Sequence, residues 1–277
     1  MATGIPHGPK RIEKLMDLPY YTEGPVTDSK GNSFCTTLGA GLIMKTDENG
    51  LVTEWAKSPS PNGQIILPDD IHLVCDREKG IRKFAADGRW IKDVAGKSCA
   101  GVPVYCPNDL VADKAGNIYY TDSVRNTGKI CFIGIDGGET VIADELDFPN
   151  GIILSNDETI LYIAESYKNR ILKIDLASAG KPTADPIVFA KLPRHVSGNL
   201  IDNLPDGLAL SHDGNIYVAH YGMQAIQVLS PEGNLLSTID TGLPLTSNLF
   251  FIDHSSLLFT GGFTESGPGG LYKIYSE

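Results

Sequence analysis

The chain has 277 residues and a formal net charge of -11, with 34 acidic and 23 basic side chains. This charge repels phosphate backbones and anionic lipids, and no run of Lys or Arg offsets it, so we expect neither nucleic acid nor a membrane as a partner. The first 15 residues lack the apolar core of a secretory signal, and no later stretch is long enough to span a bilayer. These features predict a cytoplasmic protein.

The cysteines give no sign of a disulfide framework or a zinc site. They are odd in number, scattered along the chain and never spaced as C-x-x-C. We therefore interpret most of them as small buried hydrophobic residues. The five positions are Cys35, Cys75, Cys99, Cys106 and Cys131.

One pattern recurs six times: a turn with Gly, Asn or Asp, a β-rich strand, a polar interval and a second apolar strand. The copies begin near residues 30, 68, 115, 156, 212 and 254. This spacing of roughly 40 to 55 residues is typical of four-stranded propeller blades. No segment shows a sustained helical stripe, and six units are too many for a sandwich or barrel, the main rival. The sequence predicts an all-β protein, with one six-bladed β-propeller over residues 1–277.

A second motif precedes four of these repeats and places an acid or amide beside Pro and Gly or Asp. In a propeller it lies at the start of the innermost strand, beside the central channel. Each motif alone is an ordinary turn sequence, but its repetition in four blades favours a joint site. Two carboxylates and two amide oxygens suit a hard cation, Ca²⁺ first, with Mg²⁺, Mn²⁺ or Zn²⁺ as alternatives. The predicted metal ligands are Glu23, Asn108, Asn150 and Asp206.

These motifs carry a resemblance to a known family. Glu-Gly-Pro at 23, Pro-Asn-Asp-Leu at 107, Phe-Pro-Asn-Gly-Ile at 148 and Pro-Asp-Gly-Leu-Ala-Leu at 205 resemble the gluconolactonase/regucalcin family of metal-dependent sugar lactonases. The resemblance runs from about Glu23 to the C-terminus. It implies that Glu23, Asn150 and Asp206 are metal ligands, that Asn108 is a ligand or close neighbour, and that the metal polarises a lactone carbonyl. Asp206 is then our candidate for the base that takes a proton from the attacking water.

One departure from the family leaves the substrate open. Members that act on sugar lactones often carry Arg two positions before the Asn of the second motif, where this chain has Cys106. Candidates to line a substrate pocket are Asn62, Tyr105, Cys106, His220 and Tyr221, and a structural role is an equal alternative for each. Cys106 is not expected to be a nucleophile, because no His or Asp partner is evident.

The leading hypothesis is a metal-dependent hydrolase that opens a small lactone, most simply an aldonolactone of carbohydrate metabolism. Alternatives are an organophosphate or ester hydrolase of the diisopropylfluorophosphatase type and a non-enzymatic calcium-binding propeller. The segment 260–269 lacks the His that diisopropylfluorophosphatases place near their site, which favours the lactonase. His195, beside Arg194 in the insertion before Asp206, is interpreted as a solvated loop residue. We expect a monomer, because a propeller closes its own edges.

Overall fold

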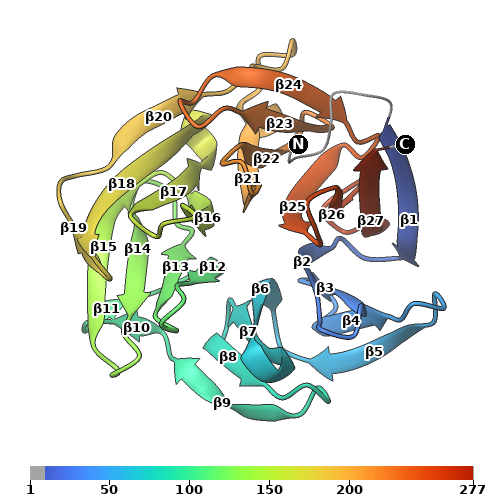
Figure 1. The fold of residues 1–277 in the computed structure, drawn as a ribbon, viewed down its shortest axis with the longest axis horizontal. Coiled ribbons are helices and arrows are strands. Elements are labelled where there is room, and N and C mark those ends of the chain that lie inside the picture. The colour runs from blue at the N-terminus through green and yellow to red at the C-terminus, as the bar shows by residue number, and fades with distance from the viewer. Residues whose placement is uncertain (1–9, 277) are drawn as a thin grey trace.

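The computed structural model describes residues 10–276, which form six antiparallel sheets arranged around a central axis (Figure 1). The predicted all-β six-bladed propeller is confirmed. The expectation of one domain over residues 1–277 extends to residues 1–9 and 277, which lie outside this described part, and stays a prediction. Between residues 10 and 276, no helix has the length and apolar character needed to cross a membrane.

Each of the first three blades follows the chain outward, from an inner strand at the axis to an outer strand at the rim (Figure 1). Their strands are β2 (Glu23–Thr27), β3 (Ser33–Thr37), β4 (Leu42–Thr46) and β5 (Val52–Lys57); β6 (Pro61–Leu67), β7 (Ile71–Asp76), β8 (Gly80–Phe84) and β9 (Trp90–Ala95); and β12 (Pro107–Ala112), β13 (Ile118–Asp122), β14 (Gly128–Ile133) and β15 (Glu139–Leu146).

The fourth and fifth blades repeat this order, and the sixth combines the two ends of the described chain. Their strands are β16 (Pro149–Leu154), β17 (Ile160–Glu165), β18 (Arg170–Ser178) and β20 (Ile187–Lys191); β21 (Leu204–Leu210), β22 (Ile216–Tyr221), β23 (Ala225–Leu229) and β24 (Leu235–Asp240); and β25 (Leu245–Phe251), β26 (Ser256–Gly262), β27 (Gly269–Ser276) and β1 (Lys10–Leu18). The short elements are β10 (Ser98–Cys99), β11 (Val102–Pro103), β19 (Lys181–Pro182), η1 (Pro68–Asp70), η2 (Ser166–Lys168) and η3 (Leu200–Asp202).

Strand β1 closes the ring. It pairs antiparallel with β27, from Lys10 opposite Ser276 to Leu18 opposite Gly269, and forms the outer edge of the sixth blade (Figure 1). Met16 and Leu18 anchor this strand in the core, with side chains that are almost completely buried. The first blade therefore packs against a sheet built from both ends of the chain, which makes the propeller a closed structure.

The hydrophobic core is divided among the blades. Between residues 10 and 276, the buried apolar residues form six clusters, one at each interface between neighbouring blades. Because successive side chains of a strand point to opposite faces, one strand serves two interfaces. In β13, Ile118 and Tyr120 pack toward the second blade, whereas Tyr119 packs toward the fourth. This two-sided burial explains the nearly continuous apolar runs of the middle strands.

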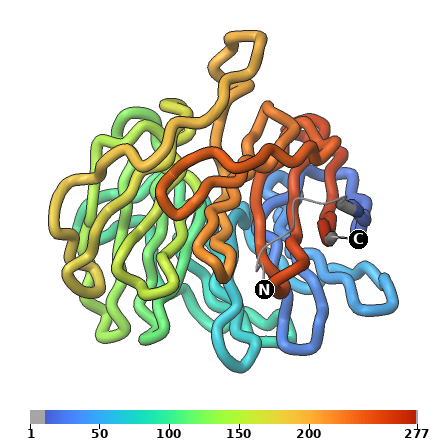
Figure 2. Tube along the Cα trace, turned by 45° about the horizontal axis from the view of Figure 1, so that its top comes forward, coloured from blue at the N-terminus to red at the C-terminus, as the bar shows by residue number. Residues whose placement is uncertain are grey.

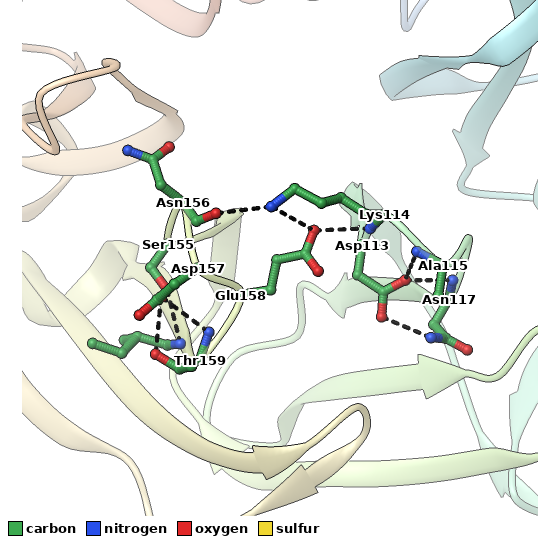
Figure 3. Close-up of polar contacts among 10 residues, drawn as sticks. Asp113, Lys114, Ala115, Asn117, Ser155, Asn156, Asp157, Glu158 and Thr159 are labelled. Carbon is green, nitrogen blue, oxygen red and sulfur yellow. Dashed lines mark hydrogen bonds and ion pairs between the residues drawn. The ribbon is translucent and has the colours of Figure 1, made fainter.

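Polar turns join the inner and second strands at the end of the propeller opposite the inner-strand starts. In the third blade, the Asp113 carboxylate accepts hydrogen bonds from the backbone N–H groups of Ala115 and Asn117, at 3.0 and 2.9 Å (Figure 3). Lys114 reaches the fourth blade, where its backbone N–H donates to Glu158 at 2.8 Å. Asx-type turns of this kind fix the hairpins that the recurring turn residues Gly, Asn and Asp predict.

All five cysteines are free, and four of them are buried, whereas Cys106 is partly exposed. Three lie in the cluster between the second and third blades: Cys75, Cys99 and Cys131. Their interpretation as small buried hydrophobic residues is therefore confirmed.

Candidate functional site

All six inner strands share a β-bulge near their starts. In each blade the pairing between the inner and second strands shifts by one residue at this point, which turns side chains out of the regular pleat. The first residues of these strands can thus face the axis instead of a neighbouring blade. The shifts lie between Glu23 and Val26, Pro61 and Gln64, Pro107 and Leu110, Pro149 and Ile152, Pro205 and Leu208, and Thr246 and Leu249.

The bulges bring five oxygen-bearing side chains into one cavity of about 410 Å³ at the end of the channel where the inner strands begin. Four of them are the predicted ligands, and the fifth is Asn62, which holds the corresponding place in the second blade. Each is at least 93% buried. The sixth blade has Ser247 at this place, but its hydroxyl donates to the Thr22 carbonyl at 2.8 Å, away from the cavity. The five donors are Glu23, Asn62, Asn108, Asn150 and Asp206.

The next residue in each inner strand lies one layer deeper. A Cβ atom on Gly63 or Gly207 would collide with the Asp109 and Asn248 side chains, respectively, so these two glycines make room for polar groups of the next blade. Asn248 Nδ2 donates to Asp109 Oδ2 at 3.5 Å. Glycine thus occupies four of the six places in this layer, Gly24, Gly63, Gly151 and Gly207, which lets the inner strands approach the axis closely.

Three buried carboxylates crowd this end of the channel. Burial raises the pKa of Glu23 to about 8, and the nearby Asp109 carboxylate adds to the shift. Burial also raises the pKa of Asp109 to about 7. The pKa of Asp206 lies well above its usual range, because the group is buried and because Glu23 and Asp109 repel its charge. Without a cation among them, these groups favour their protonated forms.

Hydrogen bonds do not occupy all the side-chain oxygen atoms of the five predicted and candidate ligands, so some of these atoms can bind a cation. Glu23 Oε1 accepts from the Tyr21 hydroxyl at 3.1 Å. Glu23 Oε2 and Asn62 Oδ1, however, are buried and have no hydrogen-bond partner. Of the ion pairs in the described part of the chain, none involves Glu23, Asp109 or Asp206. Buried acceptors and carboxylates without a positive partner fit a hard divalent cation.

The donor set is rich in amides. Within residues 10–276, no group of three or more His, Cys, Asp or Glu side chains is arranged to hold a metal ion. The candidate site combines two carboxylates, Glu23 and Asp206, with three amide side chains. Such a set offers only oxygen atoms, which suits Ca²⁺ or Mg²⁺ better than a soft metal.

Buried acids at the ends of the second strands hold the loops that enter the site. Asp76 accepts from the Ser60 N–H at 3.0 Å, just before the inner strand of the second blade. Asp122 accepts from the N–H groups of Tyr105 and Cys106, at 2.9 and 2.7 Å. Glu165 accepts from the Asp147 N–H at 2.9 Å in the fourth blade. These bonds fix the start of each inner strand and so the position of its donor.

Two of the five predicted pocket residues line the cavity, Asn62 and Tyr221. The other three do not belong to the described lining. The Tyr105 side chain is 63% exposed and lies outside it, and Cys106 is held beside it by the bonds of both N–H groups to Asp122. His220 is completely buried, and its Nδ1 lies 3.3 Å from Gln227 Nε2. Burial lowers the pKa of His220 to about 4.

Most of the remaining lining comes from the connections between strands. Two aromatic residues, Phe148 and Tyr167, meet edge to face at 5.5 Å between ring centroids. Phe148 begins the Phe-Pro-Asn-Gly-Ile motif but was not predicted to line the pocket, and Tyr167 lies in η2, which no motif marks. The residues that sequence reasoning missed are Tyr21, Leu38, Arg77, Phe148, Ser166, Tyr167, Ile201, Asp202, Leu204, Leu245 and Glu265.

The connection between β20 and β21 projects from the body of the propeller, as the gold segment in Figure 2 shows. Ile201 and Asp202 from this loop reach the cavity. His195 is exposed, and its Nδ1 lies 2.8 Å from the Ser197 hydroxyl and 3.7 Å from Asp202. Arg194 and His195 are not among the described lining residues, in keeping with their interpretation as loop residues.

Comparison with known proteins agrees with this architecture. Residues 21–261 match the family described as "SMP-30/Gluconolactonase/LRE-like region". A protein named lactonase drp35 from Staphylococcus aureus (bovine strain RF122) is 33% identical over 276 residues, covering 91% of this chain and 82% of that protein.

Two solved structures share the fold. A gluconolactonase from Xanthomonas campestris superimposes with a TM-score of 0.82 at 24% identity, covering 99% of this chain and 94% of its own. Regucalcin from Agrobacterium tumefaciens, described as a calcium-binding protein, superimposes with a TM-score of 0.79 at 19% identity, over 100% and 98% of the two chains. The family match covers most of the sequence and contains all the predicted ligands. The chain therefore belongs to the SMP-30/gluconolactonase/LRE-like family.

Proposed function

We propose that the protein is a divalent-metal-dependent lactonase, which hydrolyses a small lactone to its hydroxy acid. One observation carries this proposal: five buried oxygen donors converge on one cavity, and two of their oxygen atoms, on Glu23 and Asn62, lack any hydrogen-bond partner. Membership of the family, together with relatives named lactonase and gluconolactonase, supports a lactone as the substrate.

Glu23, Asn108, Asn150 and Asp206 would hold the cation, with Asn62 as a further donor. When bound, a divalent cation supplies a positive charge that polarises the carbonyl of the lactone. The family likeness favours Ca²⁺, with Mg²⁺, Mn²⁺ or Zn²⁺ as alternatives. Tyr21 orients one of the two carboxylates, because its hydroxyl donates a hydrogen bond to Glu23 Oε1 at 3.1 Å.

In the reaction, water adds to the carbonyl carbon and the bond from that carbon to the ring oxygen breaks. Asp206 is the proposed catalytic base, which takes a proton from the attacking water and returns it to the leaving alkoxide. The hydroxy acid that forms contains all the atoms of the lactone and of one water molecule. The aromatic side chains Phe148 and Tyr167 form an apolar part of the cavity that can shield the ring from solvent.

We also propose that the protein acts in the cytoplasm as a monomer. All five cysteines are free, which suits the reducing conditions of the cytoplasm. A monomer is favoured because β1 pairs with β27 and closes the ring between the two terminal strands of the described chain.

The test is acid release from a panel of sugar lactones and simple γ- and δ-lactones, with Asp206→Asn and Asp202→Asn as a matched pair. Both replacements remove one carboxylate that lines the cavity, but only Asp206 belongs to the inner-strand donors. We expect Asp206→Asn to lose about 100-fold or more in turnover and Asp202→Asn to retain most of it. Failure to open any lactone in the presence of metal would exclude the lactonase. Substantial turnover by a metal-loaded Asp206→Asn would exclude Asp206 as the base.

A further inference from the structure

The cavity has an uneven distribution of charge. Its described lining contains four carboxylates, two of them in the proposed metal site and two, Asp202 and Glu265, outside it. The same lining contains a single basic side chain, that of Arg77 in the turn between β7 and β8. This arginine is the one positive group that a substrate would meet among the described walls of the cavity.

The two outer carboxylates already have partners other than Arg77. Asp202 Oδ2 accepts from the Ser197 hydroxyl at 2.5 Å and from Asn199 Nδ2 at 3.2 Å. Glu265 Oε1 accepts from the Tyr221 hydroxyl at 3.0 Å. No ion pair within residues 10–276 involves Arg77. Its charge is therefore not neutralised by the described protein.

The backbone of Arg77 is held firmly, whereas the residue is exposed and its side chain forms no ion pair with the described part of the chain. Its N–H donates to the Ser60 carbonyl at 3.0 Å, and its carbonyl accepts from Lys97 Nζ. The preceding Asp76 carboxylate fixes the same turn. The guanidinium lies near the Cys106 thiol. Burial raises the pKa of Cys106, so this neighbour stays neutral and leaves the charge of Arg77 available.

We propose that Arg77 determines specificity by binding an anionic substituent, a carboxylate or a phosphate, that the lactone carries away from its reacting carbonyl. The inference rests on the proposed function, because it concerns the substrate of the same cavity. A planar guanidinium with free N–H groups binds such oxyanions through two parallel hydrogen bonds. The acidic character of the rest of the lining makes Arg77 necessary, since these carboxylates repel an anion that has no positive partner.

The kinetic test uses two lactones that differ in one group. γ-Valerolactone carries a methyl group on the ring carbon where 5-oxotetrahydrofuran-2-carboxylate carries a carboxylate. We expect Arg77→Gln to lower kcat/KM for the carboxylated lactone about tenfold, through KM, and to change that for γ-valerolactone less than twofold. For the carboxylated lactone, the kcat/KM of Arg77→Lys should lie between those of the wild type and Arg77→Gln. Arg89→Gln, at an exposed position in the β8–β9 turn of the same blade, should match the wild type.

A binding measurement separates this inference from the proposed function. Calorimetric titration of metal-free protein with the carboxylated lactone should show about tenfold weaker binding to Arg77→Gln than to the wild type or Arg89→Gln. Equal affinities, or no detectable binding to the wild type, would overturn the role of Arg77. Binding that depends on Arg77 without metal-dependent turnover of either lactone would instead support Arg77 and overturn the lactonase.

Discussion

The buried His72 imidazole should make folding stability depend on pH. His72 lies on β7 and is 1% exposed, and its Nδ1 is 3.1 Å from Gln64 Oε1. Because Gln64 Nε2 donates to the Gly24 carbonyl, the Gln64 oxygen faces the ring and Nδ1 carries the proton. Trp55 and Phe34 pack on the ring, with centroid distances of 4.2 and 4.7 Å. These contacts accommodate a neutral imidazole, but they leave no space for water molecules that would hydrate its charged form.

Burial lowers the pKa of His72 from 6.5 to about 4, even though the carboxylates of Asp28 and Asp70 favour the charged form. Between these two pKa values the unfolded chain binds a proton that the folded chain does not. The stabilising contribution is therefore complete above pH 6.5 and is lost progressively as the pH falls toward 4. The loss between pH 7 and pH 5 amounts to about 2 kcal/mol of unfolding free energy.

The assay is denaturant unfolding of the wild type and His72→Gln at pH 7 and pH 5. Glutamine can donate to Gln64 but does not titrate, so the variant should lose about 2 kcal/mol less than the wild type between the two pH values. The control His254→Gln alters an exposed histidine, keeps the buried imidazole and should follow the wild type. An equal pH dependence in His72→Gln and the wild type would refute the assignment to His72.

Three further predictions concern the closing strand β1, the packing of Gly207 beside the axis and the Cys106 thiol. Met16→Ala should lower the unfolding free energy by about 3 kcal/mol, measured in denaturant, because it leaves a cavity under the closing strand; an effect below about 1 kcal/mol would contradict a buried β1. Gly207→Ala should cost about 2 kcal/mol and weaken metal binding, because its Cβ would collide with Asn248, whereas Gly96→Ala meets open space; similar melting temperatures for the two variants would count against this packing. Cys106→Ser should keep lactone turnover within twofold of the wild type, and a large loss would reopen a chemical role for the thiol.

The repeat pattern was sufficient to predict the fold, because each blade contains its own hairpin signals. The strand over residues 10–18 escaped prediction, since its pairing partner lies some 250 residues away and its charged residues, such as Lys14 and Asp17, mask the alternation. Such long-range pairing leaves no local signature in the sequence. The closing strand became visible only in the structure.

The site was predictable where a bulge motif marks it. Asn62, in its Pro-Asn-Gly segment, was assigned to the substrate pocket, but its place in the blade is equivalent to that of the predicted ligands. Tyr105 and Cys106 lie just before Asn108 in the chain, but neither is among the described lining residues, and Asp122 accepts hydrogen bonds from both of their backbone N–H groups. Arg77 and Glu265 lie in loops without any motif, so only the structure could bring them to the cavity.

The most direct test of the proposed metal site is hydrolysis of glucono-, galactono- and xylonolactone by protein stripped with a chelator, before and after addition of Ca²⁺, Mg²⁺, Mn²⁺ or Zn²⁺. The wild type should be inactive when stripped and recover on metal addition, with a higher melting temperature. Glu23→Gln, which keeps the shape of the side chain but removes its charge, should need a higher metal concentration for both effects. Full lactone hydrolysis in the stripped protein, or metal stabilisation that is unchanged in Glu23→Gln, would contradict the proposed metal site.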